Sequence, residues 1–300
     1  MTVTVKDSAA PATPGTVWLS LMPGLFVVLW STGFIGAKFG LPYAEPLTFL
    51  ALRFGIVAAL MLAVSLATGA AWPRTWRAAG HSAVVGLLIQ AVYLGGVYYG
   101  IAHGISAGLS ALIVGLQPVL TAAVARSVLG ETVAPRQWLG VALGFAGVIL
   151  VVWSKLAFDV GHLAAFLTTA LALLGMTAGT LYQKRFCPVI DLRSATFIQN
   201  AAAGVAVLVL ALCLETMHIN WRIEFVAALT WLCLVLSVVT MMLFLFILRR
   251  GAAARIASLF YLVPPVTAFM AYLLFGETLG ATALVGMALT AVGVALVNRG

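Results

Sequence analysis

The side chains of this sequence that could bind a small molecule are hydroxyls, amides and aromatic rings placed inside long apolar segments. Apart from one histidine they cannot carry charge near neutral pH, so they would hold a ligand by hydrogen bonds and ring contacts. Such a site suits a small zwitterion or an uncharged amphipathic molecule, because a phosphate or a sugar nucleotide would need an Arg or Lys clamp. The candidates are Trp30, Ser31, Gln90, Tyr93, Tyr98, Tyr99, His103, Ser110, Gln117, Thr180, Tyr182, Ser237, Thr240, Phe244, Ser258 and Tyr261.

The acidic residues decide which coupling chemistry is available. None of the eight Asp and Glu residues falls in the middle of an apolar segment. Because intramembrane carboxylates are the usual proton relays, this argues against a pump that binds cationic drugs on a buried Glu. It favours facilitated export down a gradient, or coupling through His103, whose ring can titrate near neutral pH. The other interpretation of His103 is a hydrogen bond in a loop.

Two Gly-Glu-Thr sequences, at residues 130–132 and 276–278, end apolar segments. Glu131 and Glu277 could be proton-coupling carboxylates. Alternatively, Gly ends one helix and Glu or Thr begins the turn to the next. We favour the structural interpretation, because the predicted topology places the two carboxylates at opposite faces of a membrane.

Arg53 is a cation well inside an apolar segment, about seven residues or about 10 Å from its start. Long cationic side chains usually extend towards the nearest aqueous interface, so we expect Arg53 to do the same. The alternative is a carboxylate or carbonyl partner inside the membrane.

Pro118 and Pro264 lie inside two of the apolar segments. Each would remove a backbone hydrogen bond and kink its helix. The kink could merely shape packing, but its duplication favours a role in curving a gate. Close-packing faces are predicted at Gly140, Gly144, Gly147, Gly286 and Gly293.

Other function classes are poorly supported. Residues 104–108 match the GxSxG pattern of serine hydrolases, but that pattern needs a preceding strand, and helix ends flank it here. The sequence contains no HExxH and no phosphate-binding loop, and its three cysteines show no metal-ligand grouping. An ion channel is disfavoured because no ring of acids and no carbonyl filter is visible. We therefore expect no catalytic activity, no metal and no cofactor.

The amino-acid composition indicates that the chain lies in a membrane. Of 300 residues, 63% are hydrophobic and 8% are charged, whereas soluble domains carry about 25% charged residues. The long apolar runs predict an all-α integral membrane protein of ten transmembrane helices, each of about 20 residues. We place them at about 17–39, 46–68, 81–102, 106–128, 136–154, 161–183, 192–214, 223–248, 252–275 and 281–298.

Positive charge predicts the orientation of these helices. With a cytoplasmic N-terminus, 12 of the 16 Lys and Arg residues lie at cytoplasmic helix ends. Cytoplasmic loops of membrane proteins carry such an excess, so both termini are predicted to be cytoplasmic. Residues 1–16 form a short polar tail, and no loop is long enough for a soluble domain.

The chain repeats itself. A constant shift of 146 residues carries one Gly-Glu-Thr sequence onto the other and Pro118 onto Pro264. The repeats are predicted at 17–154 and 161–300, each with five helices. Because five is odd, the second copy must be inverted in the membrane, as in many secondary transporters. We expect the two inverted repeats to enclose a central cavity.

Three motifs carry a family resemblance. Residues 29–38, LWSTGFIGAK, resemble the first-helix motif of the drug/metabolite transporter superfamily. Residues 115–132 resemble its fourth-helix and Gly-Glu signature, and residues 261–278 resemble it again. The chain therefore resembles the EamA type, and its Leu-Trp-Ser-Thr start resembles the YddG-like amino-acid exporters. This resemblance implies a basket of ten helices around a cavity lined by helices 1, 3, 4, 6, 8 and 9.

The resemblance also implies a function. It predicts an exporter of amino acids, aromatic ones included, that works by alternating access in the inner (plasma) membrane. Its partners would be a small-molecule substrate and the lipid bilayer, without nucleic acid, and it would act as a monomer. The alternatives are export of other small metabolites or drugs and, from different classes, an intramembrane serine hydrolase or an ion channel.

Overall fold

The computed structural model describes residues 14–129, 135–156, 163–187, 190–240, 243, 260–277 and 280–298. Within these ranges the regular elements are helices, and an isolated bridge joins Ala44 to Ile219. Six helical segments are long and apolar enough to cross a membrane, and three further apolar helices are shorter. The prediction of an all-α protein with membrane-spanning helices is confirmed to this extent.

The described residues of the first half form nine helical elements. They are α1 (Pro14–Gly40), η1 (Leu41–Tyr43), α2 (Pro46–Ala67), α3 (Trp76–Gly86), η2 (Leu87–Leu94), α4 (Gly95–Ala102), α5 (Ala107–Val114), α6 (Gln117–Leu129) and α7 (Pro135–Leu156). The element η2 is a π-helix, and it joins α3 and α4 into one continuous segment.

The second half follows a similar order. Its described elements are α8 (Leu163–Phe186), α9 (Leu192–Leu214), α10 (Ile223–Thr230), η4 (Trp231–Thr240), η5 (Phe260–Leu262), α13 (Val263–Phe275) and α14 (Ala281–Asn298). Like η2, η4 is a π-helix. A shift of 146 residues carries residues 87–94 onto 233–240, so the two π segments stand at corresponding places in the sequence.

The helix predicted at 81–102 begins five residues earlier, at Trp76. It begins there because the Thr75 hydroxyl accepts a hydrogen bond of 3.2 Å from the backbone N–H of Ala78, which caps the first turn.

The helix predicted at 106–128 is interrupted in the turn before Pro118, where the sequence predicts a kink. It ends at Val114, turns through Gly115 and Leu116, and starts again at Gln117. Pro118 therefore lies in the first turn of α6, and Pro264 lies in the first turn of α13. At these positions the missing N–H of proline leaves no hydrogen bond unmade.

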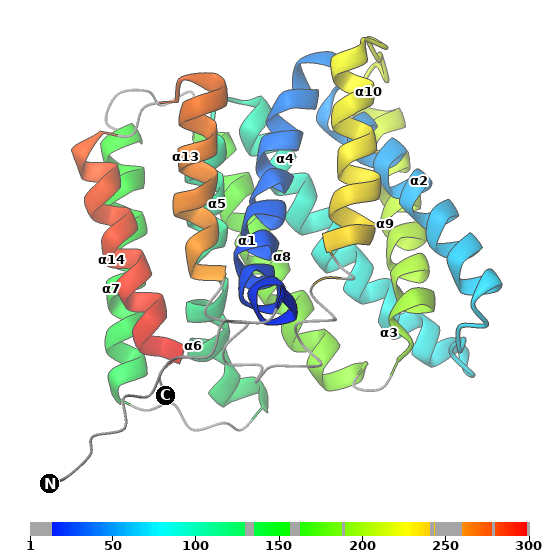
Figure 1. The fold of residues 1–300 in the computed structure, drawn as a ribbon, viewed down its shortest axis with the longest axis horizontal. Helices are drawn as coiled ribbons and strands as arrows, with labels where there is room; N and C mark the ends of the chain where they lie inside the picture. The colour runs from blue at the N-terminus through cyan, green and yellow to red at the C-terminus, as the bar shows by residue number, and fades with distance from the viewer. Residues whose placement is uncertain are drawn as a thin grey trace, which may run out of the picture.

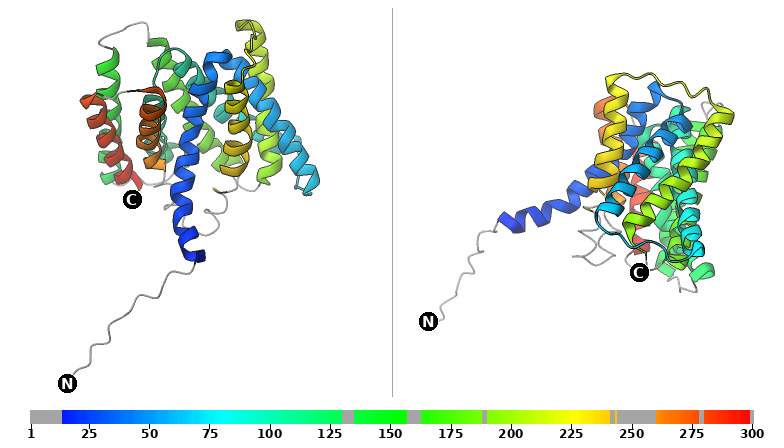
Figure 2. Two further views of the ribbon diagram at one scale, coloured as in Figure 1. Left: turned by 45° about the horizontal axis from the view of Figure 1, so that its top comes forward. Right: turned by 90° about the vertical axis from the view of Figure 1, so that its right-hand side faces the viewer.

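The helices lie side by side, with α1 near the middle of the bundle in the view of Figure 1. Helix α7 packs on α14 at one edge, and α2 packs on α9 at the other. Between them, α13 contacts both α1 and α5, and α8 contacts η2 and α4. Helix α1 begins and α14 ends at the same end of the bundle (Figures 1 and 2).

The contact between α7 and α14 is made by small residues, as predicted. A Cβ atom on Gly147 would approach the Gly286 carbonyl oxygen to 2.5 Å. A Cβ atom on Gly293 would approach the Gly140 carbonyl oxygen to the same distance. Because both positions exclude a side chain, the two backbones can touch along this face.

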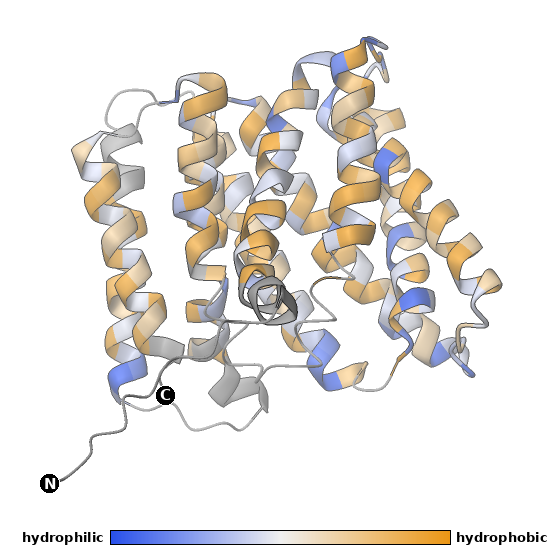
Figure 3. Cartoon of the chain, viewed as in Figure 1, coloured by the Kyte–Doolittle hydropathy of each residue, from blue (hydrophilic) through white to orange (hydrophobic). Residues whose placement is uncertain are grey.

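Large apolar side chains occupy both the interior and the outer surface. Fully buried rings such as Phe26, Phe49 and Phe225 fill the space between helices, while Leu210 and Leu284 are about half exposed on the outside. Many of the polar residues lie towards the two ends of the bundle (Figure 3). This distribution suits a protein whose outer surface faces lipid.

Candidate functional site

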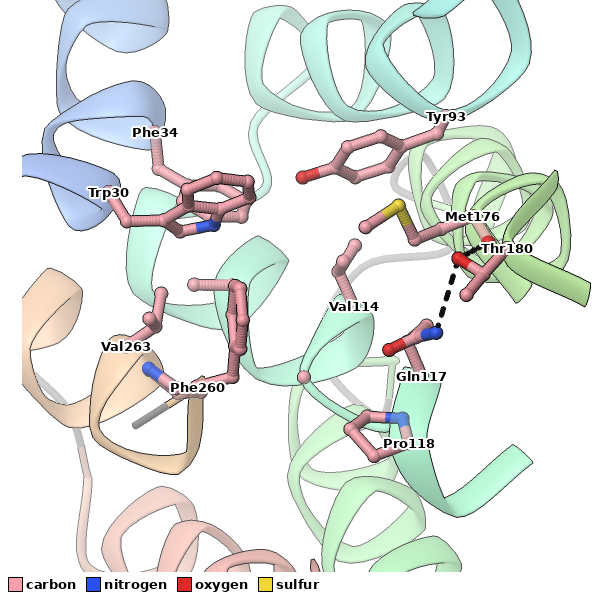
Figure 4. Close-up of a pocket in the computed structure, with 13 residues that line it drawn as sticks. Trp30, Phe34, Tyr93, Val114, Gln117, Pro118, Met176, Thr180, Phe260 and Val263 are labelled. Carbon is pink, nitrogen blue, oxygen red and sulfur yellow. Dashed lines mark hydrogen bonds between the residues drawn. The ribbon is translucent and has the colours of Figure 1, made fainter. Parts of the chain in front are cut away.

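A cavity of about 220 Å³ lies between the two halves of the chain (Figure 4). The first half contributes α1, η2, α5 and α6, and the second half contributes α8, η5 and α13. The residues that line it are Trp30, Phe34, Tyr93, Ala111, Val114, Gly115, Gln117, Pro118, Met176, Thr180, Phe260, Val263 and Pro264.

One wall of the cavity is aromatic. The rings of Trp30 and Phe260 meet edge to face, with centroids 5.1 Å apart. Phe26 packs behind both rings, at 5.6 Å from Trp30 and 5.5 Å from Phe260. Such rings offer an apolar ligand a large contact area in fixed orientations.

The opposite wall presents an oriented amide. The Gln117 side-chain nitrogen donates to the hydroxyls of Thr121 (3.1 Å) and Thr180 (3.4 Å). The Thr180 hydroxyl in turn donates to the Met176 carbonyl at 2.7 Å. These bonds turn the Gln117 amide so that its oxygen faces the cavity (Figure 4). Among the described residues that oxygen has no donor, so it can accept a hydrogen bond from a ligand.

Tyr93 supplies a second polar group. The residue is 8% exposed, and its hydroxyl points into the cavity (Figure 4). Within the described ranges that hydroxyl has no hydrogen-bond partner, so it can donate to a ligand. None of the residues that line the cavity is charged.

The break between α5 and α6 borders the cavity. Gly115 lies so close to Pro264 that a Cβ atom added to Gly115 would stand 2.9 Å from the Pro264 Cγ. Both residues line the cavity, as does Pro118. Pro118 and Pro264, which correspond in the repeat, therefore line the same cavity.

Of the residues selected from the sequence, Trp30, Tyr93, Gln117, Thr180, Pro118 and Pro264 line this cavity. Ser31 is buried beside it instead, and donates to the carbonyls of Val27 (2.8 Å) and Val263 (3.4 Å). Gln90 is half buried on η2, and Ser110 is buried on α5 without a partner among the described residues.

Other selected residues lie nearer the ends of the bundle or bond within their own helix. Tyr99 stacks on His103 with centroids 3.8 Å apart, and the exposed His103 places Nδ1 2.8 Å from the Tyr99 carbonyl oxygen. The Tyr182 hydroxyl lies 2.8 Å from His81 Nδ1. Ser237 and Thr240 each donate to a carbonyl five residues earlier in η4.

The remaining selected residues cannot be placed in full. Phe244, Ser258 and Glu131 lie outside the described residues. Tyr261 belongs to η5, but its side chain is outside the described part of the chain.

The interpretation of Arg53 as a residue that extends to the interface was wrong. Its side chain lies in the interior, with 6% of the residue exposed, and it donates to the Tyr98 hydroxyl at 3.0 Å. Packing of α2 against α4 and α9 covers the path to the surface. Tyr98 therefore does not line the cavity but holds a buried guanidinium.

Residues that sequence reasoning missed complete the cavity. They are mostly apolar: Phe34, Ala111, Val114, Gly115, Met176, Phe260 and Val263. Helical spacing could have found several of them. Phe34 lies four residues after Trp30, and Met176 lies four residues before Thr180, so each shares a helix face with a selected residue.

Residues 18–153 and 163–299 each match the EamA-like transporter family. The chain belongs to the EamA-like transporter family. It is a multi-pass membrane protein with two copies of the family domain, and this family is one of transporters rather than enzymes.

The relatives of this EamA-like chain include other transporters. It is 24% identical to the uncharacterized transporter YvbV of Bacillus subtilis, covering 93% of this chain and 91% of that one. It is 25% identical to the uncharacterized inner membrane transporter YedA of Escherichia coli K12, with 94% and 92% covered. It is 24% identical to a probable amino-acid metabolite efflux pump of Salmonella typhimurium LT2, with 90% and 91% covered.

The EamA-like fold is also seen in a solved protein. A structure described only as "Crystal structure of protein" matches with a TM-score of 0.64, over 92% of this chain and 96% of that chain. The two sequences are 17% identical. At that identity the likeness establishes the fold alone.

Proposed function

We propose that this EamA-like transporter exports amino acids and related small metabolites through the cavity between its halves. The observation that carries this proposal is the composition of that cavity. An aromatic wall faces two groups with unused hydrogen-bonding capacity, the Tyr93 hydroxyl and the Gln117 amide oxygen. A volume of about 220 Å³ suits a molecule of amino-acid size.

The relatives support this substrate class. One of them is named as a probable amino-acid metabolite efflux pump, and it aligns with 90% of this chain. Another is named as an inner membrane transporter. We extend both descriptions to this chain and propose that it lies in the inner membrane with both termini in the cytoplasm, which its excess of Lys and Arg at one set of helix ends supports. It functions as a monomer, because its own two halves enclose the cavity.

An inverted pair of five-helix repeats explains how the cavity could open alternately to the two sides. Two observed pairings agree with such a pseudo-twofold relation: α7 with α14 and α2 with α9 each join corresponding segments. The contacts of η2 with α8 and of η4 with α1 are a further corresponding pair. Exchanging the conformations of the two repeats would then exchange the open end.

We infer that the end of the cavity towards the last residues of α1 is closed in this conformation, because small residues pack the helices together there. Between the cavity and the end where α1 finishes, Ala37, Ala107 and Ala271 are completely buried. Gly108 packs so closely on α13 that a Cβ atom on it would stand 3.0 Å from Ala268 Cα. Small residues thus bring α1, α5 and α13 into direct contact, and export requires these helices to separate.

The hydrolase alternative has a structural counter-argument. Ser106, the serine of the GxSxG pattern, is the N-cap of α5 and accepts a hydrogen bond of 3.2 Å from the Leu109 N–H. The nearby His103 ring turns its Nδ1 to a backbone carbonyl. Neither geometry prepares a nucleophile and base. Ser106→Ala should therefore leave transport intact, and hydrolysis that disappears in this variant would support the enzyme.

Counterflow in proteoliposomes tests the proposal. Vesicles preloaded with one unlabelled compound are diluted into a trace of the same compound in labelled form, and exchange is compared with empty vesicles. The panel contains aromatic, aliphatic and polar amino acids, nucleosides, sugars and a cationic dye. We expect exchange of aromatic or aliphatic amino acids. Exchange of only non-amino-acid compounds would contradict the substrate class, and no exchange of any compound would contradict the function.

A further inference from the structure

Arg53 brings a positive charge into the interior, and no carboxylate in the described part of the chain pairs with it. The residue is 6% exposed and sits within α2, a segment of 22 residues apolar enough to cross a membrane. A buried charge of this kind is costly unless a partner compensates it, and in membrane segments such residues usually have a functional role.

The contacts of Arg53 are incomplete. One guanidinium nitrogen donates to the Tyr98 hydroxyl at 3.0 Å, which is a neutral acceptor. The other recorded contact is to its backbone, where the Cys233 thiol lies 3.9 Å from the carbonyl oxygen. A guanidinium has five N–H donors, so Tyr98 satisfies only part of this group.

No carboxylate in the described part of the chain pairs with Arg53. Four described acids have other partners. Glu277 pairs with Lys38, and Asp191 pairs with Arg193. Glu45 accepts a hydrogen bond from Thr216, and Glu215 accepts one from the Leu47 N–H. A bound ligand with a negative charge would supply the counter-charge that the described residues do not provide.

The aromatic residues beside Arg53 connect it to the cavity. Tyr93 and Tyr98 belong to the continuous η2–α4 segment, and Arg53 donates a hydrogen bond of 3.0 Å to the Tyr98 hydroxyl, five residues after Tyr93. Tyr93 directs its hydroxyl into the cavity (Figure 4). Charges act over longer distances in an apolar interior than in water, so the cavity near Tyr93 lies within the field of Arg53.

The polarity of the cavity matches one ligand chemistry. A carboxylate placed next to Tyr93 would accept a hydrogen bond from its hydroxyl and would experience the Arg53 charge. An ammonium group could donate to the Gln117 amide oxygen on the α6 side. No acidic side chain lines the cavity, so nothing there compensates a ligand with a net positive charge.

We propose that Arg53 is the positioning and specificity-determining residue that makes the cavity select molecules with a carboxylate. It acts from behind Tyr93 and Tyr98 rather than as a lining residue. This inference rests on the proposed export function and narrows it: carboxylate-bearing substrates are accepted, and analogues in which the carboxylate is replaced by a neutral group are rejected.

The test uses three probes that share a phenyl ring: L-phenylalanine, L-phenylalaninamide and 3-phenylpropionate. Each competes with the labelled substrate identified by counterflow in wild-type proteoliposomes. The wild type should bind phenylalanine and phenylpropionate about tenfold more tightly than phenylalaninamide. An amide that competes as well as the amino acid would overturn the inference without any variant, while transport itself would still support the proposed function.

Variants of Arg53 distinguish an effect of its charge on binding from an effect on the fold. Arg53→Met should weaken the two carboxylate probes about tenfold while leaving the amide within about twofold. Arg53→Lys keeps the charge and should restore most of the preference. Arg222→Met, at the N-cap of α10, removes a cation outside the helix and should change none of the three affinities. Equal weakening of all three probes in Arg53→Met, or failure of Arg53→Lys to restore the preference, would reduce Arg53 to a structural role.

Discussion

Lys38 of α1 and Glu277, directly after α13, form an ion pair that joins the two halves of the chain. Glu277 also accepts a hydrogen bond of 3.3 Å from the backbone N–H of Ala107, at the start of α5. The Lys38 ammonium lies 4.9 Å from the centre of the Phe275 ring. One carboxylate at the end of α13 therefore also contacts α1 and α5.

Charge reversal tests this ion pair. Lys38→Glu and Glu277→Lys should each destabilise the protein by about 1–2 kcal/mol, because both side chains are partly buried and would face a like charge. The double swap should recover part of the loss, but not the bond from Ala107, since Lys cannot accept it. Thermal unfolding in detergent measures all three proteins. A double swap as unstable as the sum of the single variants would show that the pair contributes nothing.

Adding a methyl group to a glycine between α7 and α14 should destabilise the protein by steric overlap. Gly147→Ala places a Cβ atom against the Gly286 carbonyl oxygen, and Gly293→Ala does the same against Gly140. Each should cost about 1–3 kcal/mol, since two backbones must move apart. Gly55→Ala is the matched control, because a Cβ atom there meets nothing within 4 Å. The control should be neutral or stabilising by up to about 1 kcal/mol in thermal unfolding. Similar losses in all three variants would contradict the close approach.

Asp191 predicts a pH dependence of stability. Hydrogen bonds from the Arg193 side chain, and further ones from the backbone N–H groups of Arg193 and Ala71, hold the pKa of this carboxyl well below its usual value. Because the pKa is lower in the folded state, the stabilisation is complete above the unfolded-state pKa of about 3.9 and is lost as pH falls further. Asp191→Asn should lower the midpoint of thermal unfolding at pH 7 by about 2 °C.

The same variant should also flatten the fall in stability below about pH 4. Arg193→Met should flatten it as well, because it removes the largest cause of the shifted pKa. Unfolding midpoints measured from pH 7 to pH 3 would contradict this account if wild type and Asp191→Asn fell in parallel.

Replacing Thr180 should moderately weaken substrate binding in the cavity. Thr180→Val removes a hydroxyl that helps to orient the Gln117 amide. A neutral hydrogen bond contributes about 1 kcal/mol, so we expect KM to rise about fivefold with little change in protein stability. Thr196→Val is the control, because Thr196 makes the same bond to its own helix as Thr180 but lies away from the cavity on α9. Equal effects on KM would argue against an orienting role.

The positions of most of the described helices could be predicted from the sequence, because apolar runs of about 20 residues and the Gly, Pro and charged residues between them leave few other choices. A kink at Pro118 could be predicted as well, because proline removes a backbone hydrogen bond. The close approach of Gly115 to Pro264 could not, since it joins segments far apart in the sequence.

The directions in which the side chains of the three neighbouring tyrosines point could not be predicted either. Tyr93 lines the cavity, whereas Tyr98 is turned to Arg53 and Tyr99 to His103. A regular helix of 3.6 residues per turn would fix these directions. The π-helix η2 adds residues to its turns and shifts the phase of everything after it. The burial of Arg53 could not be predicted for a related reason. Its partner, Tyr98, follows η2, so the direction of the Tyr98 side chain depends on the shift that the π-helix introduces.

Counterflow of an amino acid by cavity variants tests the central claim most directly. Tyr93→Phe and Gln117→Leu each remove one polar group that faces the cavity, and Tyr272→Phe removes a hydroxyl from an exposed ring on α13. We predict that the two cavity variants raise KM for the exchanged amino acid about fivefold or more, while Tyr272→Phe behaves as wild type. Cavity variants that exchange the amino acid with wild-type KM would contradict the claim that this cavity is the binding site.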